Sequence, residues 1–282
     1  MNKVLHNLEK FCCPLCKGTL SLENNTINCK HCNSAFYFHN NTLMLYKKNI
    51  TQAVTDSYDK LKFLFKKWPK LYNLLVQIIS PVYVSRHIKK FLHNNYSLGT
   101  FVCNLGSGNT TLHPDCINID CIAYDAVDVT ADIEHIPVCD EVCDGVFIVG
   151  VLEHVSNPCA VVSEIHRILK KQGWVYAFYP FMQGYHASPH DYSRLTHEGL
   201  RQLFNNFDTV TIMASGGPTS GFLWLFQEWL AMILSLGFTP LFYIWLIVLM
   251  VITFPVKFLD IVLIKHPVAY HITSGFTVIA KK

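Results

Sequence analysis

The 282-residue sequence predicts a doubly wound α/β fold, preceded by a small cysteine-rich unit and interrupted by an apolar helical hairpin before its last strand. Three observations lead to this prediction. Short apolar runs alternate with helical patterns over residues 96–215. Two Cys-x-x-Cys pairs occur between Cys13 and Cys32. No residue between Trp229 and Val256 carries a charge, which indicates a buried or membrane-associated segment.

The composition narrows the class of protein. Apolar residues make up 51% of the chain and charged residues 15%, whereas about 25% charged is typical of soluble proteins. This excludes a disordered chain. Residues 1–95 carry a net charge of +10 and the remainder −7, which favours a partner with phosphates, such as anionic lipid or nucleic acid. Eleven cysteines cannot all pair within one chain, and free thiols indicate a reducing compartment, the cytoplasm.

The alternating region predicts buried parallel strands, because each apolar run is bounded by Gly, Asp or Pro. They are expected at residues 101–105, 116–119, 127–130, 145–150 and 175–179. A helix is predicted over residues 158–171, with Asn157 as its N-cap and Lys170 and Lys171 at its negative end. The remaining elements are a helix at 196–207 and strands at 209–214 and 275–280.

The composition also divides the chain into four regions. The expected units are a cysteine-rich unit at 1–46, a basic helical linker at 47–95, an α/β domain at 96–217 together with 273–282, and an apolar insertion at 218–272.

The cysteine-rich unit has the spacing of a zinc ribbon. Its candidate ligands are Cys13, Cys16, Cys29 and Cys32, in two Cys-x-x-Cys knuckles. Four protein ligands leave no open position, so the expected Zn²⁺ is structural. The alternative is a set of buried or reactive thiols. The segment resembles the small zinc ribbons that accompany or activate methyltransferases.

A glycine-rich turn after the first strand is the first candidate cofactor site. Gly106 and Gly108 let the backbone approach a ligand closely. Asp120 ends the next strand, where a carboxylate can accept both ribose hydroxyls, and Asp132 follows the third strand, where it can accept from an adenine amino group. No third glycine follows at the dinucleotide spacing, which argues against NAD.

These motifs, followed by Val-Leu-Glu-His at 151–154, together resemble the class I S-adenosylmethionine (SAM)-dependent methyltransferases, closest to the quinone and small-molecule group. The resemblance implies a Rossmann-like methyltransferase sheet and SAM as cofactor. The cofactor-binding residues it implies are Asn104, Gly106, Gly108, Asp120, Asp132, Glu153 and His154.

The sequence departs from that family in two places. The family usually has Asp or Glu where this chain has Asn104, which offers no charge to the cofactor's ammonium group. Residues 109–115 are too few for a crossover helix, so we expect a turn there. These departures motivate an alternative hypothesis, a methyltransferase-fold scaffold that has lost catalysis.

Candidate acceptor-side residues follow the fifth strand. His186 and His190 can take a proton near neutral pH, and Asp191 can orient one of them. These three are the predicted catalytic residues, and Arg194 can hold an anionic acceptor. The alternative is that Asp191 and Arg194 only pair to hold the loop.

The apolar insertion predicts two helices, at 222–236 and 241–254, that are each too short to cross a bilayer core of about 30 Å. A proline at 255 is expected to end the second. Interfacial tryptophans and a basic aromatic run at 60–70 favour membrane contact over a buried hairpin. Because the strands on either side of the insertion should pair, we expect a re-entrant hairpin in one leaflet.

The sequence therefore predicts a SAM-dependent methyltransferase that acts on a lipid-linked or amphipathic small-molecule or glycan acceptor at the membrane surface. It would be cytoplasmic, peripheral or monotopic on the inner face of a membrane, with no DNA partner. The alternative enzyme is an RNA methyltransferase whose zinc ribbon binds RNA.

Overall fold

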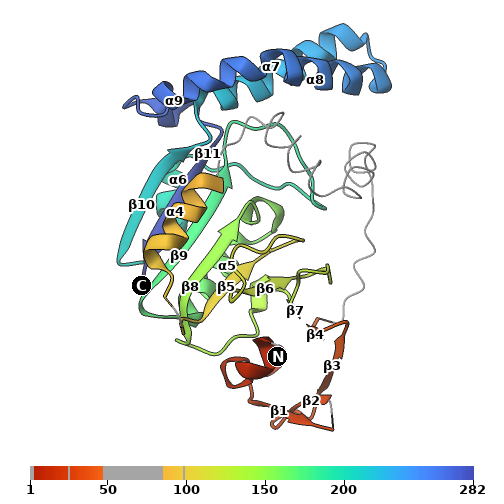
Figure 1. The fold of residues 1–282 in the computed structure, drawn as a ribbon, viewed down its shortest axis with the longest axis vertical. Helices are drawn as coiled ribbons and strands as arrows, with labels where there is room; N and C mark the ends of the chain where they lie inside the picture. The colour runs from red at the N-terminus through yellow and green to blue at the C-terminus, as the bar shows by residue number, and fades with distance from the viewer. Residues whose placement is uncertain (1–2, 25, 47–84, 98) are drawn as a thin grey trace.

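The computed structural model describes residues 3–24, 26–46, 85–97 and 99–282. Most of the predicted basic linker, including the run at 60–70, lies outside the described residues. The sheet runs through the middle of the molecule, with the cysteine-rich unit at one end and the apolar helices at the other (Figure 1).

The central sheet has the predicted doubly wound architecture. Its strand order is β7-β6-β5-β8-β9-β11-β10, and all neighbours are parallel except β11, which pairs antiparallel with β9 and β10. The strands are β5 (Val102–Leu105), β6 (Ile117–Asp120), β7 (Val129–Thr130), β8 (Cys143–Val149), β9 (Leu169–Pro180), β10 (Thr209–Ser215) and β11 (Gly275–Lys281). The fold is therefore Rossmann-like, and the predicted antiparallel pairing of the last two strands is confirmed.

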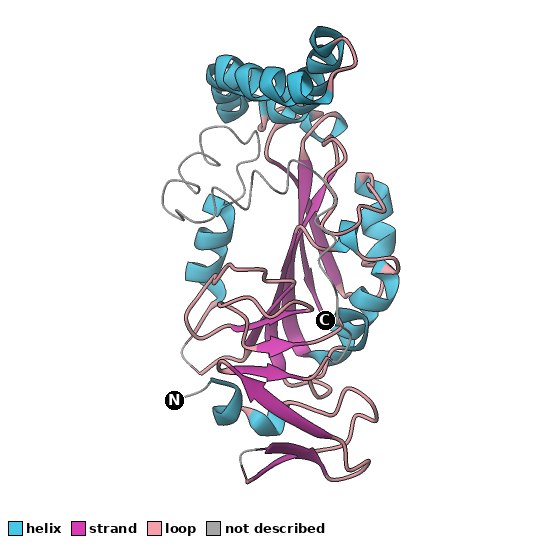
Figure 2. Cartoon of the chain, turned by 90° about the vertical axis from the view of Figure 1, so that its right-hand side faces the viewer, coloured by secondary structure: helices cyan, strands magenta, loops and turns pink. Residues whose placement is uncertain are grey.

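Helices cover both faces of this sheet (Figure 2). On one face lies α4 (Ser85–Asn95), whose Phe91 packs against Trp174 and Tyr176 at ring distances of 4.9 and 5.0 Å. On the other lie α5 (Pro158–Ile168) and α6 (His197–Leu203). Short 3₁₀ turns occur at Leu8–Lys10, Ile133–His135, Leu152–His154 and Ala269–His271.

Helix α5 starts as predicted but ends early. The Asn157 side chain accepts a hydrogen bond from the Ala160 N–H, as an N-cap does. The helix stops at Ile168 because Leu169 pairs with Cys143 as the first residue of β9. The prediction that Lys170 and Lys171 end the helix is therefore wrong, since both lie in the strand.

The cysteine-rich unit extends the main sheet. It contains α1 (Lys3–His6), β1 (Leu20–Glu23), β2 (Thr26–Cys29), β3 (Ala35–His39) and β4 (Thr42–Met44). The four strands form an antiparallel meander, and β4 then pairs parallel with β7. Phe11 is buried and meets Phe101 edge to face at 5.9 Å. The unit thus shares core with the α/β region, while the domain boundary at residue 46 stays a prediction.

The apolar insertion is a helical hairpin with longer helices than predicted. Helix α7 spans Pro218–Ser235, and α8 (Thr239–Thr253) continues through a 3₁₀ segment (Phe254–Leu259) into α9 (Asp260–Leu263). Tighter winding at Phe254–Leu259 accommodates the proline, so the chain stays helical over 25 residues. That is about 37 Å, enough by length and composition to cross a membrane. The prediction that both helices are too short was wrong for this one.

Candidate active site

The turn after β5 requires glycine. Gly106 and Gly108 have positive φ values of +62° and +53°. A Cβ at Gly106 would lie less than 3.0 Å from a methyl of Val151, whereas nothing lies within 4 Å of one at Gly108. The bare backbone at Gly106 therefore lets the turn pack against the segment that follows β8, and the open space at Gly108 is available to a ligand.

Asp120 ties this turn to the end of β6. Its Oδ2 accepts a hydrogen bond from the Gly108 N–H at 2.8 Å, and its Oδ1 accepts from the Ile122 N–H at 2.9 Å. The residue is buried. Each carboxylate oxygen can accept a further hydrogen bond. Asp120 thus positions both loops and keeps acceptor capacity for a ligand, while its contact with a ribose stays a prediction.

Asn104 has a structural role that explains why it is an amide. Its Nδ2 donates to Asn118 Oδ1 at 3.1 Å and to the Thr110 carbonyl at 3.2 Å, and the side chain is buried. A carboxylate could make neither bond, because both partners are oxygens. These bonds fasten the connection between β5 and β6, which contains no helix within its described residues, as predicted.

Asp132 lies at the same edge of the sheet as Asp120, after β7. Its Oδ1 accepts from the Glu134 N–H at 3.0 Å and caps a 3₁₀ turn. Burial, followed by the charge of Asp132, raises the pKa of nearby Tyr46. Tyr46 was not among the predicted site residues.

Asp191 anchors the loop after β9. Both of its oxygens accept from the guanidinium of Arg194, and Oδ2 also accepts from the His186 N–H at 2.9 Å. Burial acts to raise the pKa of Asp191, but these bonds outweigh it and lower the pKa overall. Asp191 therefore bonds to the backbone of His186. Its Oδ2 lies 3.8 Å from Nδ1 of the His186 imidazole, which is too far for a hydrogen bond. This geometry matches the alternative in which Asp191 and Arg194 hold the loop.

His186 and His190 are placed differently. The His186 ring lies 5.4 Å from that of His154, and its Nε2 lies 3.8 Å from Glu153 Oε1. His190 is exposed with its ring against Tyr192, and only its carbonyl reaches the cluster, where it contacts His154 Nδ1 at 2.6 Å. The structure therefore brings His186 together with the Glu153–His154 motif and leaves the His190 side chain outside.

Glu228 completes this side of the site and was not predicted. Its Oε1 accepts from Trp224 Nε1 at 2.8 Å, and the Trp224 ring lies 5.9 Å from that of His186. A Cβ on Gly184 would lie less than 3.0 Å from Glu228 Oε1, so only glycine allows this approach. Burial raises the pKa of Glu228. Its one signal in the sequence is that no other acidic residue occurs between residues 216 and 259.

Two hollows border the acceptor side. One, of about 270 Å³, has a mixed lining of two tyrosines with polar and charged residues, namely Gln183, Tyr185, Asp191, Tyr192, Ser193 and Arg194. The other, of about 380 Å³, is apolar and is lined by Met182, Phe222, Leu225, Phe226, Trp229 and Ile272. Adjacent residues of one loop, Met182 and Gln183, contribute to the two hollows. The arrangement suits a molecule with a polar and an apolar part.

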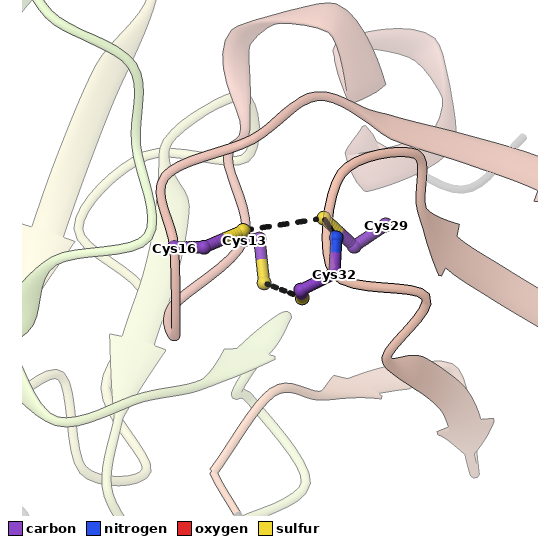
Figure 3. Close-up of side chains that lie close together, drawn as sticks. All are labelled: Cys13, Cys16, Cys29 and Cys32. Carbon is purple, nitrogen blue, oxygen red and sulfur yellow. Dashed lines mark hydrogen bonds between the residues drawn. The ribbon is translucent and has the colours of Figure 1, made fainter.

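The four cysteines of the two knuckles converge (Figure 3). The Cys13–Cys32 and Cys16–Cys29 sulfur distances are 3.6 and 3.5 Å, and all four sulfurs lie within 4.8 Å of one another. A tetrahedral Zn²⁺ with Zn–S bonds of about 2.3 Å separates its sulfurs by about 3.8 Å. The residues therefore fit a structural zinc ion.

Residues 111–177 match a family model described as Methyltransferase domain. No curated protein sequence matches the chain. Among solved structures, phosphoethanolamine N-methyltransferase 2 of Haemonchus contortus, with phosphomonomethylethanolamine and S-adenosylhomocysteine, is 14% identical over 81% of this chain and 58% of that chain, with a TM-score of 0.48. A SAM-dependent methyltransferase of Archaeoglobus fulgidus is 14% identical over 80% and 100% of the two chains, with a TM-score of 0.46.

A possible histamine N-methyltransferase of Thermotoga maritima is 17% identical over 53% of this chain and 83% of that chain, with a TM-score of 0.39. The matched domain covers β6, β7, β8 and α5 and contains Asp120, Asp132, Glu153 and His154 of the predicted cofactor-binding residues, whereas the glycine-rich turn precedes it. The matched segment is a methyltransferase domain, and the Rossmann-like sheet that contains it supports a methyltransferase activity for the chain.

Proposed function

We propose that this methyltransferase transfers the methyl group of SAM to an amphipathic or lipid-linked small-molecule or glycan acceptor at a membrane surface. The four-cysteine cluster would hold a structural zinc ion. SAM supplies an activated methyl on its sulfonium. Gly106, Gly108 and Asp120 would hold the cofactor, and the polar groups around His186 would bind the head of the acceptor.

The observation that carries this proposal is that α7 both contacts the acceptor loop and exposes apolar side chains to solvent. Near its middle, Trp224 and Glu228 face the acceptor loop. Other residues of the same helix present apolar side chains to solvent, including Phe222, Trp229, Met232 and Ile233. An apolar acceptor tail leaving the site would therefore meet the apolar hollow and the exposed helix surface, without crossing water.

Many large apolar side chains of the hairpin are exposed to solvent. At the turn between its helices, Leu236 is 81% exposed and Phe238 is 70% exposed. Further exposed apolar residues are Ile244, Ile247, Val251, Ile252, Val256, Phe258, Leu259, Ile261 and Val262. Contiguous apolar surface of this kind is typical of membrane or partner contact.

Two features favour a hairpin that lies on the membrane over one that spans it. Ser215 and Gly275 are paired residues of β10 and β11, so the chain leaves and re-enters the sheet at one place, which excludes a single crossing. The helices lie across the end of the sheet in both views (Figures 1 and 2). A hairpin in that orientation can rest in one leaflet while the site opens beside it.

Vesicle flotation of the full-length chain tests this proposal. We expect the chain to float with vesicles of phosphatidylcholine and phosphatidylglycerol. Leu236→Glu with Phe238→Glu should reduce partitioning by at least about a hundredfold, because burying each such side chain contributes about 1.5–3 kcal/mol. Leu22→Glu is the matched control, since Leu22 is also exposed but lies on β1 at the opposite end of the molecule.

Flotation of the double variant like that of the unchanged chain would contradict the membrane assignment. A chain that stays with the aqueous phase and copurifies with RNA would instead favour the RNA methyltransferase.

A further inference from the structure

Three side chains converge where the predicted cofactor motif meets the acceptor loop, namely Glu153 and His154, which were expected to bind SAM, and His186. Glu153, His154 and His186 each place one oxygen or nitrogen within 4.8 Å of the others. Glu153 Oε1 lies 3.6 Å from His154 Nε2 and 3.8 Å from His186 Nε2. The carboxylate and the first imidazole come from the turn after β8, and the second imidazole comes from the loop after β9.

Hydrogen bonds fix which nitrogen of each imidazole faces the carboxylate. His154 Nδ1 contacts the carbonyl of His190 at 2.6 Å, and His186 Nδ1 contacts the carbonyl of Gly184 at 2.9 Å. A carbonyl can only accept, so His154 Nδ1 carries a proton, which leaves the lone pair of a neutral His154 ring on Nε2, facing Glu153. His186 Nδ1 also lies 3.1 Å from the Arg194 Nη2 donor, so its contacts orient the ring with Nε2 toward Glu153 and allow either tautomer. Backbone carbonyls orient metal-bound histidines in the same way.

The distances match a shared cation better than direct hydrogen bonds. Separations of 3.6 and 3.8 Å are too long for N–H···O hydrogen bonds. Ligands about 2.0–2.2 Å from a tetrahedral metal lie about 3.3–3.6 Å apart, so a small contraction would close the site.

Glu153 provides independent evidence for an absent partner. The residue is 1% exposed. Its Oε2 is buried and has no hydrogen-bond partner among the residues that the structure describes. A buried carboxylate oxygen without a partner is strongly unfavourable, so such groups are normally paired or bound to a metal.

The surrounding charges also favour a cation. Glu228 approaches the same loop at Gly184. The positive charge of Arg194 is balanced by its pairing with Asp191. The carboxylate of Glu153 therefore faces the Nε2 atoms of two imidazoles, and Arg194 contacts the His186 ring on its other side, at Nδ1.

We propose that Glu153, His154 and His186 form a second metal site, which binds a divalent transition-metal ion, with Zn²⁺ as the first candidate. Two histidines and one carboxylate are the ligand set of open zinc and iron(II) sites. Three protein ligands leave at least one position free. This last step rests on the proposed function: the free position would take an oxygen of the acceptor head group, so the metal would orient the acceptor beside the methyl donor.

Metal content of the full-length chain tests this site. After equilibration with Zn²⁺ and removal of the excess, the chain should hold two zinc ions. Glu153→Gln and His186→Asn should each hold one, the ion of the four-cysteine cluster. His190→Asn is the matched control, because it retains the backbone carbonyl that contacts His154, and it should hold two.

Substitution with Co²⁺ separates the two sites by spectrum. The thiolate charge-transfer bands of the four-cysteine cluster should persist in Glu153→Gln, while weaker d–d bands from the nitrogen and oxygen site disappear. Circular dichroism checks that each variant is folded. One zinc ion in both the unchanged chain and folded Glu153→Gln, with identical cobalt spectra, would overturn the proposal.

Vesicle flotation and calorimetric titration with SAM test the proposed function independently of the metal site. Two zinc ions in a chain that does not float would keep the metal site and reject the membrane acceptor.

Discussion

The cofactor side and the acceptor side of this enzyme are built in different ways. The predicted cofactor side comprises Asn104, Gly106, Asp120 and Asp132, which lie within 29 residues of one another and are positioned by successive strand ends. The proposed acceptor side combines residues 183–194 and α7, which pack around the Glu153–His154 motif. Short motifs therefore describe the first, whereas the second exists only once distant segments pack together.

The largest effect on SAM binding should come from Gly106→Val. A left-handed conformation costs a non-glycine residue about 1–2 kcal/mol, and the added Cβ would also collide with Val151. We expect SAM affinity to fall by at least about a hundredfold in isothermal titration calorimetry. Gly108→Ala separates the two costs, because its φ is also positive but its Cβ would meet no protein atom, so we expect a loss of roughly tenfold from the backbone conformation and any further loss from contact with the ligand. Equal effects of the two variants would contradict the packing role of Gly106.

Asp120→Ala should have the next largest effect. A hydrogen bond to a charged group contributes about 1.5–3 kcal/mol, so loss of the ribose acceptor should weaken SAM binding roughly ten- to hundredfold. The N–H groups of Gly108 and Ile122 also lose their acceptor. Unchanged SAM affinity would place the ribose elsewhere and remove the distinction between the two sides.

Arg194→Ala should leave SAM affinity within about threefold, because Arg194 lies on the acceptor side. The Asp191 side chain is 3% exposed and would lose its partner, although Arg194 itself is 22% exposed. We expect a loss of about 2 kcal/mol and a fall in Tm of roughly 5 °C. Calorimetric unfolding and SAM titration together check this prediction, and a large loss of SAM affinity would contradict it.

The stability difference should depend on pH. The pKa of Asp191 is lowered in the folded chain, so its pairing stabilises fully above the unfolded value of about 3.9 and is lost as the pH falls through the lower folded pKa. The Tm difference between the unchanged chain and Arg194→Ala should therefore be constant near neutrality and shrink below about pH 4. A difference that grows in acid would contradict the assignment.

Sequence reasoning succeeded where neighbouring residues determine the structure. The strand ends, the N-cap at Asn157 and the missing crossover helix depend on local patterns and turned out as predicted. The end of α5 was misplaced because Lys170 and Lys171 suit a helix terminus, whereas the pairing of Leu169 with Cys143 comes from a distant segment. The pairing of β4 with β7 was missed for the same reason.

The apolar hairpin and the acceptor site show more clearly what local sequence patterns could not predict. A proline normally ends a helix, but the 3₁₀ segment at Phe254–Leu259 lets the chain remain helical. Glu228 sits some 40 residues from His186 in sequence, so no local spacing connects them. The paired role of Asp191 and Arg194 was one of two alternatives in the sequence, and only the bond geometry distinguishes them.

The most direct test of the account is methyl transfer to lipid. The full-length chain is incubated with SAM labelled on its methyl group and a membrane extract from cells that lack the protein, and the products are separated into organic and aqueous phases. We expect label in the organic phase, and at least a tenfold lower rate with Asp120→Ala at limiting SAM. Label confined to RNA in the aqueous phase, or label in lipid that is unaffected by Asp120→Ala, would contradict the account.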